Sequence, residues 1–132
     1  MSKPESCRFM KSHEWAACEG GTVAVGVSDH AQHEISDVVF VELPKIGRKV
    51  KQGEAVAVIE SVKAAFDIYA PVSGEVTAAN DAVTKDPALV NRGPHEEGWL
   101  FKIKPSQPSE LETLMDWKVY QEFVASAAAH GH

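Results

Sequence analysis

Lys63 lies between two acidic residues in the segment "ESVKAAFDIYAP", residues 60–71, and is the first candidate for chemistry. Val, Ile, Phe and Tyr residues on both sides favour β-strands, so the lysine is expected at a hairpin turn. A nucleophilic lysine must lose its charge, whereas the carboxylates of Glu60 and Asp67 favour the ammonium form. An exposed amine on a long stem suits enzymatic acylation instead. The alternative is an ordinary solvated surface lysine.

A second group of polar side chains occurs in "SHEW", residues 12–15, which combines a hydroxyl, an imidazole, a carboxylate and an indole. One interpretation is structural: a strand end whose Trp15 anchors the core. The other is functional: a rim on which Ser12 and Glu14 accept hydrogen bonds from a cationic group. Nothing within the motif decides between them.

Other catalytic or metal-binding chemistry has little support in the sequence. His30 and His33 have a helical i, i+3 spacing, but no second ligand pair follows at metal-site spacing, which favours structural or surface histidines. Motifs of serine hydrolases, P-loops and dinucleotide-binding folds do not occur. Cys7 and Cys18 form no C-x-x-C pair and are expected to be reduced thiols. We therefore expect neither a metal site nor a catalytic residue.

The composition argues against several classes of partner. The chain has 132 residues, 13 of them basic and 19 acidic, with a formal net charge of -6. This balance predicts no nucleic-acid or anionic-membrane surface, and no apolar run is long enough to span a membrane. The segment "MSKPESCRF" resembles neither a secretory signal nor a transit peptide. These features favour the cytoplasm of a bacterium, or the mitochondrial matrix if a eukaryotic presequence has been removed.

The elements that must position Lys63 are expected to be short strands. Apolar runs alternate with Gly, Pro, Asn and Asp at the close spacing typical of an antiparallel β sandwich or flattened barrel. The runs are residues 22–27, 37–43, 55–59, 65–69, 74–78 and 99–103. The segments "VKQGEAVAVIE" (50–60) and "PVSGEVTAAN" (71–80) both place Gly-Glu directly before such a run. This echo suggests two similar β units with Lys63 between them.

Helix signals are confined to a few places. Ser28 is expected to cap a short helix in "SDHAQHEIS", and Asp86, followed by Pro87, to cap another in "DPALVN". In "SELETLMDW" the spacing of Ser109 and Glu112 predicts a capping box at the start of a C-terminal helix.

Apolar residues continue one helical face beyond that point, namely Leu111, Leu114, Met115, Tyr120, Phe123 and Val124. We expect one domain over residues 1–132, with its core at about 9–105 and C-terminal helices at about 109–125 packed on the β unit. The final "HGH", residues 130–132, is expected to be disordered.

Several long segments together resemble one family, the H protein of the glycine cleavage system. They are "KSHEW", "VGVSDHAQ", "DVVFVELP", "GEAVAVIESVKAAFDIYAPVSGEV", "LVN" and "GWLFKIKPS". The resemblance runs in order from about Phe9 to Phe123. In that family the lysine of E-S-V-K carries lipoic acid in amide linkage, and the matching position is Lys63. The implied fold is mainly β with appended helices: a lipoyl/biotinyl-type barrel-sandwich hybrid with a pseudo-twofold axis and the lysine on a β-hairpin turn.

The resemblance implies a carrier rather than an enzyme. The P protein, a pyridoxal-phosphate-dependent glycine decarboxylase, would pass an aminomethyl group to the arm on Lys63. The T protein, a tetrahydrofolate-dependent aminomethyltransferase, would take the one-carbon unit, and the L protein, a dihydrolipoamide dehydrogenase, would reoxidise the arm. A separate lipoylating enzyme would attach the lipoic acid. Charge complementarity and the family's cleft near the lysine suggest Ser12, Glu14 and Asp67 as contacts of the aminomethyl ammonium.

The chain departs from the family pattern at two places. Phe66 stands where the family most often has a small residue, and it is a further candidate contact that would cover the arm or narrow its cleft. In "NRGPHEEGW" an acidic-Pro-Tyr sequence is replaced by Gly93, Pro94 and His95, and His95 is expected at the surface without a role.

Four other functions remain to be weighed. Biotin carrier domains flank their lysine with methionines, whereas Val62 and Ala64 flank it here, which favours lipoate. Lipoyl domains of 2-oxo acid dehydrogenases are tethered by flexible linkers and lack the extra terminal segments. A lipoate relay protein, which donates lipoyl groups to other enzymes, stays open, and so does a β domain used for binding alone.

Overall fold

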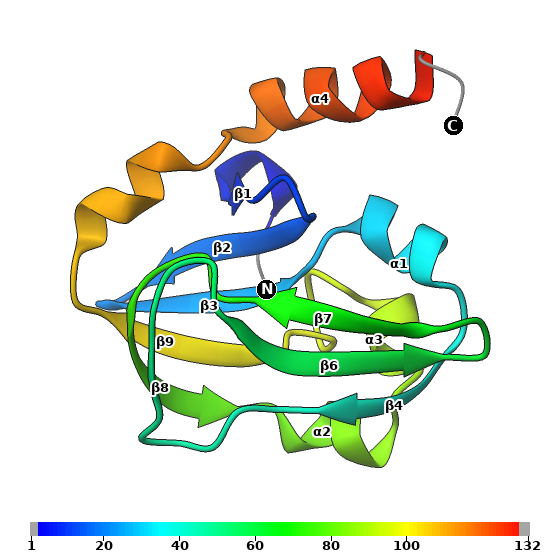
Figure 1. Ribbon diagram of the computed structural model, residues 1–132, viewed down its shortest axis with the longest axis horizontal. Helices are drawn as coiled ribbons and strands as arrows, with labels where there is room; N and C mark the ends of the chain where they lie inside the picture. Colours follow the sequence, from blue (N-terminus) through cyan, green and yellow to red (C-terminus); the bar gives the residue numbers. More distant parts are fainter. Residues whose placement is uncertain (1–2, 130–132) are drawn as a thin grey trace.

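The computed structural model describes residues 3–129, with side chains to residue 126, and folds them into two antiparallel sheets (Figure 1). One sheet has six strands in the order β1-β2-β3-β9-β8-β5, and the other has three in the order β4-β6-β7. The strands are β1 (Arg8–Phe9), β2 (Glu14–Glu19), β3 (Thr22–Val27), β4 (Val38–Glu42), β5 (Lys49–Val50), β6 (Ala55–Ser61), β7 (Ala65–Tyr69), β8 (Gly74–Ala79) and β9 (Phe101–Pro105). The expected mainly β fold with appended helices is confirmed. Residues 130–132, expected to be disordered, lie outside the described residues.

Helical segments connect and cover the sheets. They are the 3-10 helices η1 (Pro4–Ser6) and η2 (Pro108–Thr113) and the α-helices α1 (Asp29–Ile35), α2 (Asp81–Lys85), α3 (Leu89–Arg92) and α4 (Trp117–Ala129). Ser28 caps α1 as predicted, because its hydroxyl accepts the Ala31 N–H at 3.0 Å. The helix thus begins directly after β3.

Two predicted helix caps are wrong. In one the side chain pairs with another residue, and in the other the segment forms a 3-10 helix instead of the start of an α-helix. The helix after Asp86 begins at Leu89 with Ala88 at its N-cap, and the Asp86 carboxylate instead pairs with Arg92 at 2.7 Å. Ser109 lies inside η2, a 3-10 helix without a side-chain cap, so the capping box with Glu112 does not form.

The main core lies between the two sheets. Alternate residues of β3, Val23, Val25 and Val27, point into it, together with Ile59 and Ile68 of the other sheet. The intervening residues of β2 and β3 face the opposite side, where a second cluster forms around Trp15 and Ala24. A side-chain period of two therefore supplies both faces of the six-stranded sheet with apolar groups.

Helix α4 covers the second cluster, lying across β1 and β2 at the top of the view (Figure 1). Tyr120 is buried and its ring stacks on Phe9 with centroids 4.2 Å apart. Phe123 and Val124 pack on the same cluster. The predicted apolar face of the C-terminal segment is thus confirmed, and it anchors the helix to the β unit.

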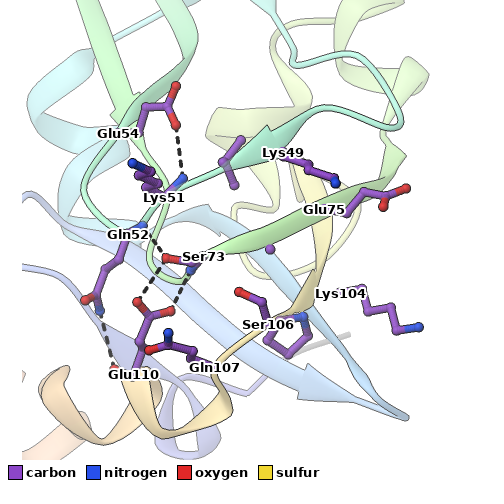
Figure 2. A pocket seen from close by; sticks show the side chains of 13 residues that line it. Lys49, Lys51, Gln52, Glu54, Ser73, Glu75, Lys104, Ser106, Gln107 and Glu110 are labelled. Carbon is purple, nitrogen blue, oxygen red and sulfur yellow. Dashed lines mark hydrogen bonds between the residues drawn. The ribbon is translucent and has the colours of Figure 1, made fainter.

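The two Gly-Glu echoes meet at one end of the molecule. Glu54 and Glu75 follow glycines with positive φ, Gly53 and Gly74, and each echo leads into a strand, β6 in one sheet and β8 in the other. Figure 2 shows the groove at this end, where Ser73 accepts the Gln52 N–H at 2.9 Å.

A carboxylate fastens the C-terminal segment to the same place. Glu110 of η2 accepts the Ser73 N–H at 2.7 Å and the Ser73 hydroxyl at 2.9 Å (Figure 2). The C-terminal segment is therefore tied down before it reaches α4.

Candidate functional site

Lys63 occupies the turn between β6 and β7, as predicted from the sequence. The Ser61 hydroxyl accepts the backbone N–H groups of Lys63 and Ala64 at 3.1 and 3.2 Å, and the Ser61 N–H donates to the Ala64 carbonyl at 2.9 Å. The Val62 N–H donates to the Asp37 carbonyl at 3.0 Å. These bonds hold a three-residue turn in one shape and leave the lysine side chain at its apex.

The Lys63 side chain is exposed and reaches α1. Its Nζ donates to the Glu34 backbone carbonyl at 3.0 Å. Figure 1 shows the β6–β7 hairpin extending to the edge of the molecule beside α1. The amine is therefore accessible to an acylating enzyme and is held by an exposed hydrogen bond.

The carboxylate of Glu14 connects the two sheets near this hairpin. Its Oε2 accepts the backbone N–H of Tyr69, in β7, at 2.8 Å, and its Oε1 accepts the Ser12 hydroxyl. Glu14 is 1 % exposed, whereas Ser12 is exposed. The expected rim is therefore a buried carboxylate under an exposed hydroxyl; Ser12 donates to Glu14, and its oxygen keeps lone pairs that can accept a further hydrogen bond.

Burial raises the pKa of Glu14 above its ordinary value, and the hydrogen bonds from Ser12 and the Tyr69 N–H oppose that shift. A buried carboxylate whose donors are neutral gains stability when a cation approaches it, because the charge is then paired. The electrostatics of this position favour a cationic ligand.

Phe66 and Asp67 point to opposite sides of β7. Phe66 is paired with Ile59 and packs, half-buried, against the main core. Asp67 is paired with Val58 and is exposed. Because side chains alternate along a strand, Phe66 closes the end of the core while Asp67 remains at the surface.

The outer edge of β7 is open, since β7 ends the three-stranded sheet. The Tyr69 N–H points outward to Glu14, so the backbone groups of Ala65 and Asp67, four and two positions earlier, point the same way. From Ala65 to Tyr69 the strand spans about 13 Å at about 3.3 Å per residue. A fully extended lipoyl-lysine spans roughly 13 Å at about 1.2 Å per bond. An arm on Lys63, which lies two residues before Ala65, that follows this edge thus runs along β7 toward Glu14.

His13, which precedes Glu14, joins the site to α4. Its Nδ1 lies 2.7 Å from the Tyr120 hydroxyl, which lies 2.6 Å from the Ser28 hydroxyl. Desolvation, and next the neighbouring His30, lower the pKa of His13. With Nδ1 of a neutral His13 unprotonated, the Tyr120 hydroxyl can donate a hydrogen bond to it and accept one from the Ser28 hydroxyl, which gives each hydroxyl a partner.

The two histidines of α1 form ordinary helical pairs. His30 lies 3.3 Å from Glu34, and His33 lies 3.6 Å from Asp29. Among residues 3–129 no group of three or more His, Cys, Asp or Glu side chains is arranged to hold a metal ion.

His95 is buried, contrary to the expected surface position. Its ring stacks on Trp15 with centroids 5.2 Å apart, and its Nδ1 lies 4.0 Å from the Cys7 sulfur. Trp15 is 0 % exposed and donates to the Pro94 carbonyl at 3.0 Å, which confirms that it anchors the core. Burial raises the pKa of Cys7 to about 12, so this thiol is inert.

Three residues that contribute contacts to the candidate site were not identified from the sequence: Ser61, Tyr69 and His13. Ser61 had a local signal, because serine hydroxyls commonly bind backbone N–H groups one to three residues further on. Tyr69 acts through its backbone N–H, for which the sequence carries no signal. His13 contacts a helix 107 residues later in the chain.

The fold and the exposed lysine on its hairpin turn define a lipoyl-type carrier fold. A crystal structure of a glycine cleavage system H protein from Mycobacterium marinum superimposes with a TM-score of 0.83 at 31% identity, covering 96% of this chain and 99% of that one. The family model described as glycine cleavage H-protein matches residues 7–127. The chain therefore belongs to the glycine cleavage H-protein family, the lipoyl carriers of the glycine cleavage system.

Curated relatives agree over nearly the full length. A glycine cleavage system H protein of Thermus thermophilus is 52% identical over 128 residues, which is 97% of this chain and all of the relative. One of Thermotoga maritima is 50% identical over 118 residues, 89% of this chain and 95% of the relative. Both organisms are bacteria. None of the helices within residues 3–129 has the length and apolar character needed to cross a membrane.

Proposed function

We propose that Lys63 carries lipoic acid in amide linkage and that the chain shuttles an aminomethyl group between enzymes, without catalytic residues of its own. The P protein, a pyridoxal-phosphate-dependent glycine decarboxylase, loads the arm, and the T protein, a tetrahydrofolate-dependent aminomethyltransferase, unloads it. The L protein, a dihydrolipoamide dehydrogenase, reoxidises it, and a lipoylating enzyme attaches it. The compartment is the bacterial cytoplasm. The observation that carries the proposal is the exposed Lys63 amine at the apex of a turn held by Ser61.

The chemistry of the arm belongs to the lipoyl group, whose disulfide opens to take the cargo and closes on reoxidation. The chain's own residues anchor and shelter it. Acylation removes the Lys63 charge, so the arm can lie on protein surface where an ammonium would not. Burial of roughly four methylenes at about 0.8 kcal/mol each favours docking, and ordering the rotors offsets about half of that. The balance favours a docked arm by about tenfold, which a partner enzyme can overcome.

In this proposal Ser12 and Glu14 hold the ammonium of the cargo, Asp67 adds an exposed carboxylate on β7, and Phe66 packs beneath the strand along which the arm lies. Glu14 supplies the charge, since its buried carboxylate has neutral donors. Replacing Glu14 by Gln keeps an acceptor for the Tyr69 N–H but removes the charge. We expect about tenfold faster loss of the aminomethyl group from the isolated loaded protein, since a charge-assisted hydrogen bond contributes roughly 1.5 kcal/mol. An unchanged rate of formaldehyde release from the loaded variant contradicts this role.

Attachment at Lys63 is tested by intact-mass analysis of protein from a lipoate-competent host. We expect one lipoyl increment that maps to Lys63 and disappears in Lys63→Arg, while Lys49→Arg, which changes another exposed lysine, keeps it. An increment that survives Lys63→Arg contradicts the assignment.

Glycine decarboxylation reconstituted with the cognate P protein tests the shuttle itself. A protein that becomes lipoylated but supports no decarboxylation acts as a lipoate relay instead.

A further inference from the structure

The three-stranded sheet turns an uncovered side toward solvent directly beside Lys63. The register pairs Phe40 with Glu60 and Glu60 with Ala65, and it pairs Glu42 with Val58 and Val58 with Asp67. Paired positions share a side of a sheet, and the alternate residues of these strands face the core. We call this surface the outer face; it consists of Phe40, Glu42, Val58, Glu60, Ala65 and Asp67.

Exposed apolar side chains gather at this end of the outer face. Phe40 is 49% exposed, Val39, at the bulge of β4, is 56% exposed, and Val62, in the lysine turn, is 69% exposed. They are three of the five large exposed hydrophobic residues among those that the structure describes. Scattered apolar residues need no explanation, but a group continuous with a reactive side chain marks a contact surface.

The charges of the outer face have one sign. Glu42, Glu60 and Asp67 are exposed, and none of the six residues of this face is basic. Glu34 and Asp37, next to the lysine turn, are also acidic and exposed. The groove at the other end differs, because its lysines are mixed with glutamates (Figure 2). Among the residues that the structure describes, Lys63 is thus the cation at the turn end of this acidic face, while Lys45 and Arg48 line a pocket with Glu42 at the other end of β4.

An enzyme that takes up the arm must cover this surface. The arm spans roughly 13 Å, so a buried cofactor receives its end only when the protein around that cofactor closes over the lysine turn and the adjoining rows of the sheet. Pyridoxal phosphate and the glycine carboxylate are both anions, and a site that binds them requires cationic groups. A tunnel leading to such a site has a positive potential, which complements an acidic face.

We infer that the outer face is the docking surface for the pyridoxal-phosphate-dependent decarboxylase, with Phe40 as its apolar anchor and the carboxylates opposite a basic tunnel mouth. This inference rests on the proposed function, since it needs an arm on Lys63. It adds a second consequence of lipoylation. Acylation of Lys63 removes the cation from the acidic surface, so the modified protein matches the decarboxylase better than the unmodified protein does.

The test measures the affinity of the lipoylated protein for the purified cognate decarboxylase by calorimetry. Phe40→Ala should weaken binding about tenfold, as truncation of a central aromatic does. Its control is Ile46→Ala, which removes another exposed apolar residue away from this face and should change nothing. Glu42→Gln should weaken binding about two- to threefold at low salt and less at high salt, whereas Glu75→Gln, in the far groove, should not.

The charge effect is tested without the arm. Lys63→Gln should bind the decarboxylase about twofold more tightly than the unlipoylated protein, and Lys63→Arg should not. Thermal melting and intact mass establish that each variant is folded and which carry the lipoyl group. Binding that is unaffected by Phe40→Ala and Glu42→Gln overturns the docking surface while leaving the shuttle intact. Equal affinities of Lys63→Gln and the unlipoylated protein overturn the charge effect. No binding by the lipoylated protein overturns the proposed function as well.

Discussion

At the scale of single residues, Glu14 is a carboxylate that the fold buries and supplies with neutral donors. Its pairing with the Tyr69 N–H fixes the distance between β2 and the outer edge of β7. The ionised form is disfavoured by burial, so the pKa is raised. A folded state that binds a proton more tightly than the unfolded chain loses stability as the pH rises through that raised pKa.

Glu14→Gln should remove this contribution to the pH dependence. The difference in unfolding free energy, variant minus wild type, should rise from the ordinary glutamate pKa of 4.5 upward and level off above the raised pKa. Gln keeps an acceptor for Tyr69 and a partner for Ser12, so packing is preserved. Urea denaturation between about pH 4 and pH 8 gives the two curves, with Glu75→Gln as an exposed control. A constant difference across that range contradicts the burial penalty.

The turn position of Lys63 has a local signal. Lys63 follows a strand-forming run and precedes another, so its turn depends on nearby residues alone. Glu14 was selected for its charge, but its burial depends on a backbone N–H 55 positions later, which no local pattern encodes. His95 was expected at the surface, whereas its ring stacks on Trp15 and is buried.

At the scale of elements, period-two runs predicted the strands well, and helix ends less well. The run 65–69 and the strand β7 coincide, since alternating apolar residues define a half-buried strand. Asp86 did not cap a helix because Arg92 competes for its carboxylate. Helix α2 was missed, although Asn80 caps it, because a five-residue helix gives too short a pattern.

The Tyr120 hydroxyl adds polar contacts to the apolar packing that anchors α4, which suggests a test at this scale. Tyr120→Phe keeps the stacking on Phe9 but removes the contacts to His13 and Ser28. The change should lower the unfolding free energy by about 1–2 kcal/mol, because His13 loses a partner in a half-buried site. Hydrogen exchange of α4 should quicken, while Val119→Ala, on the exposed face of the same helix, should change little. Unaltered exchange in α4 would show that apolar packing alone holds the helix.

At the scale of the whole molecule, the two ends differ in surface charge. The Gly-Glu turns and η2 form a mixed-charge end held by Ser73 and Glu110. The lysine turn, α1 and the outer face form an acidic end. The sheets connect the two ends through one core, and the strands of the hairpin that carries Lys63 are paired as far as Glu60 and Ala65. Mobility then belongs to the lysine side chain and to whatever it carries.

A docked arm should raise the stability of the whole molecule. If docking is favoured by tenfold, lipoylation adds about 1.4 kcal/mol to the free energy of unfolding, because the docked form exists in the folded state alone. For a chain of this size, Tm should rise by about 3–6 °C. Calorimetry of the lipoylated and unlipoylated proteins measures the shift. Lys63→Gln, which loses the charge but gains no arm, should have the same Tm as the unlipoylated protein. Equal melting of all three would mean that the arm stays in solvent and that Glu14 does not shelter the cargo.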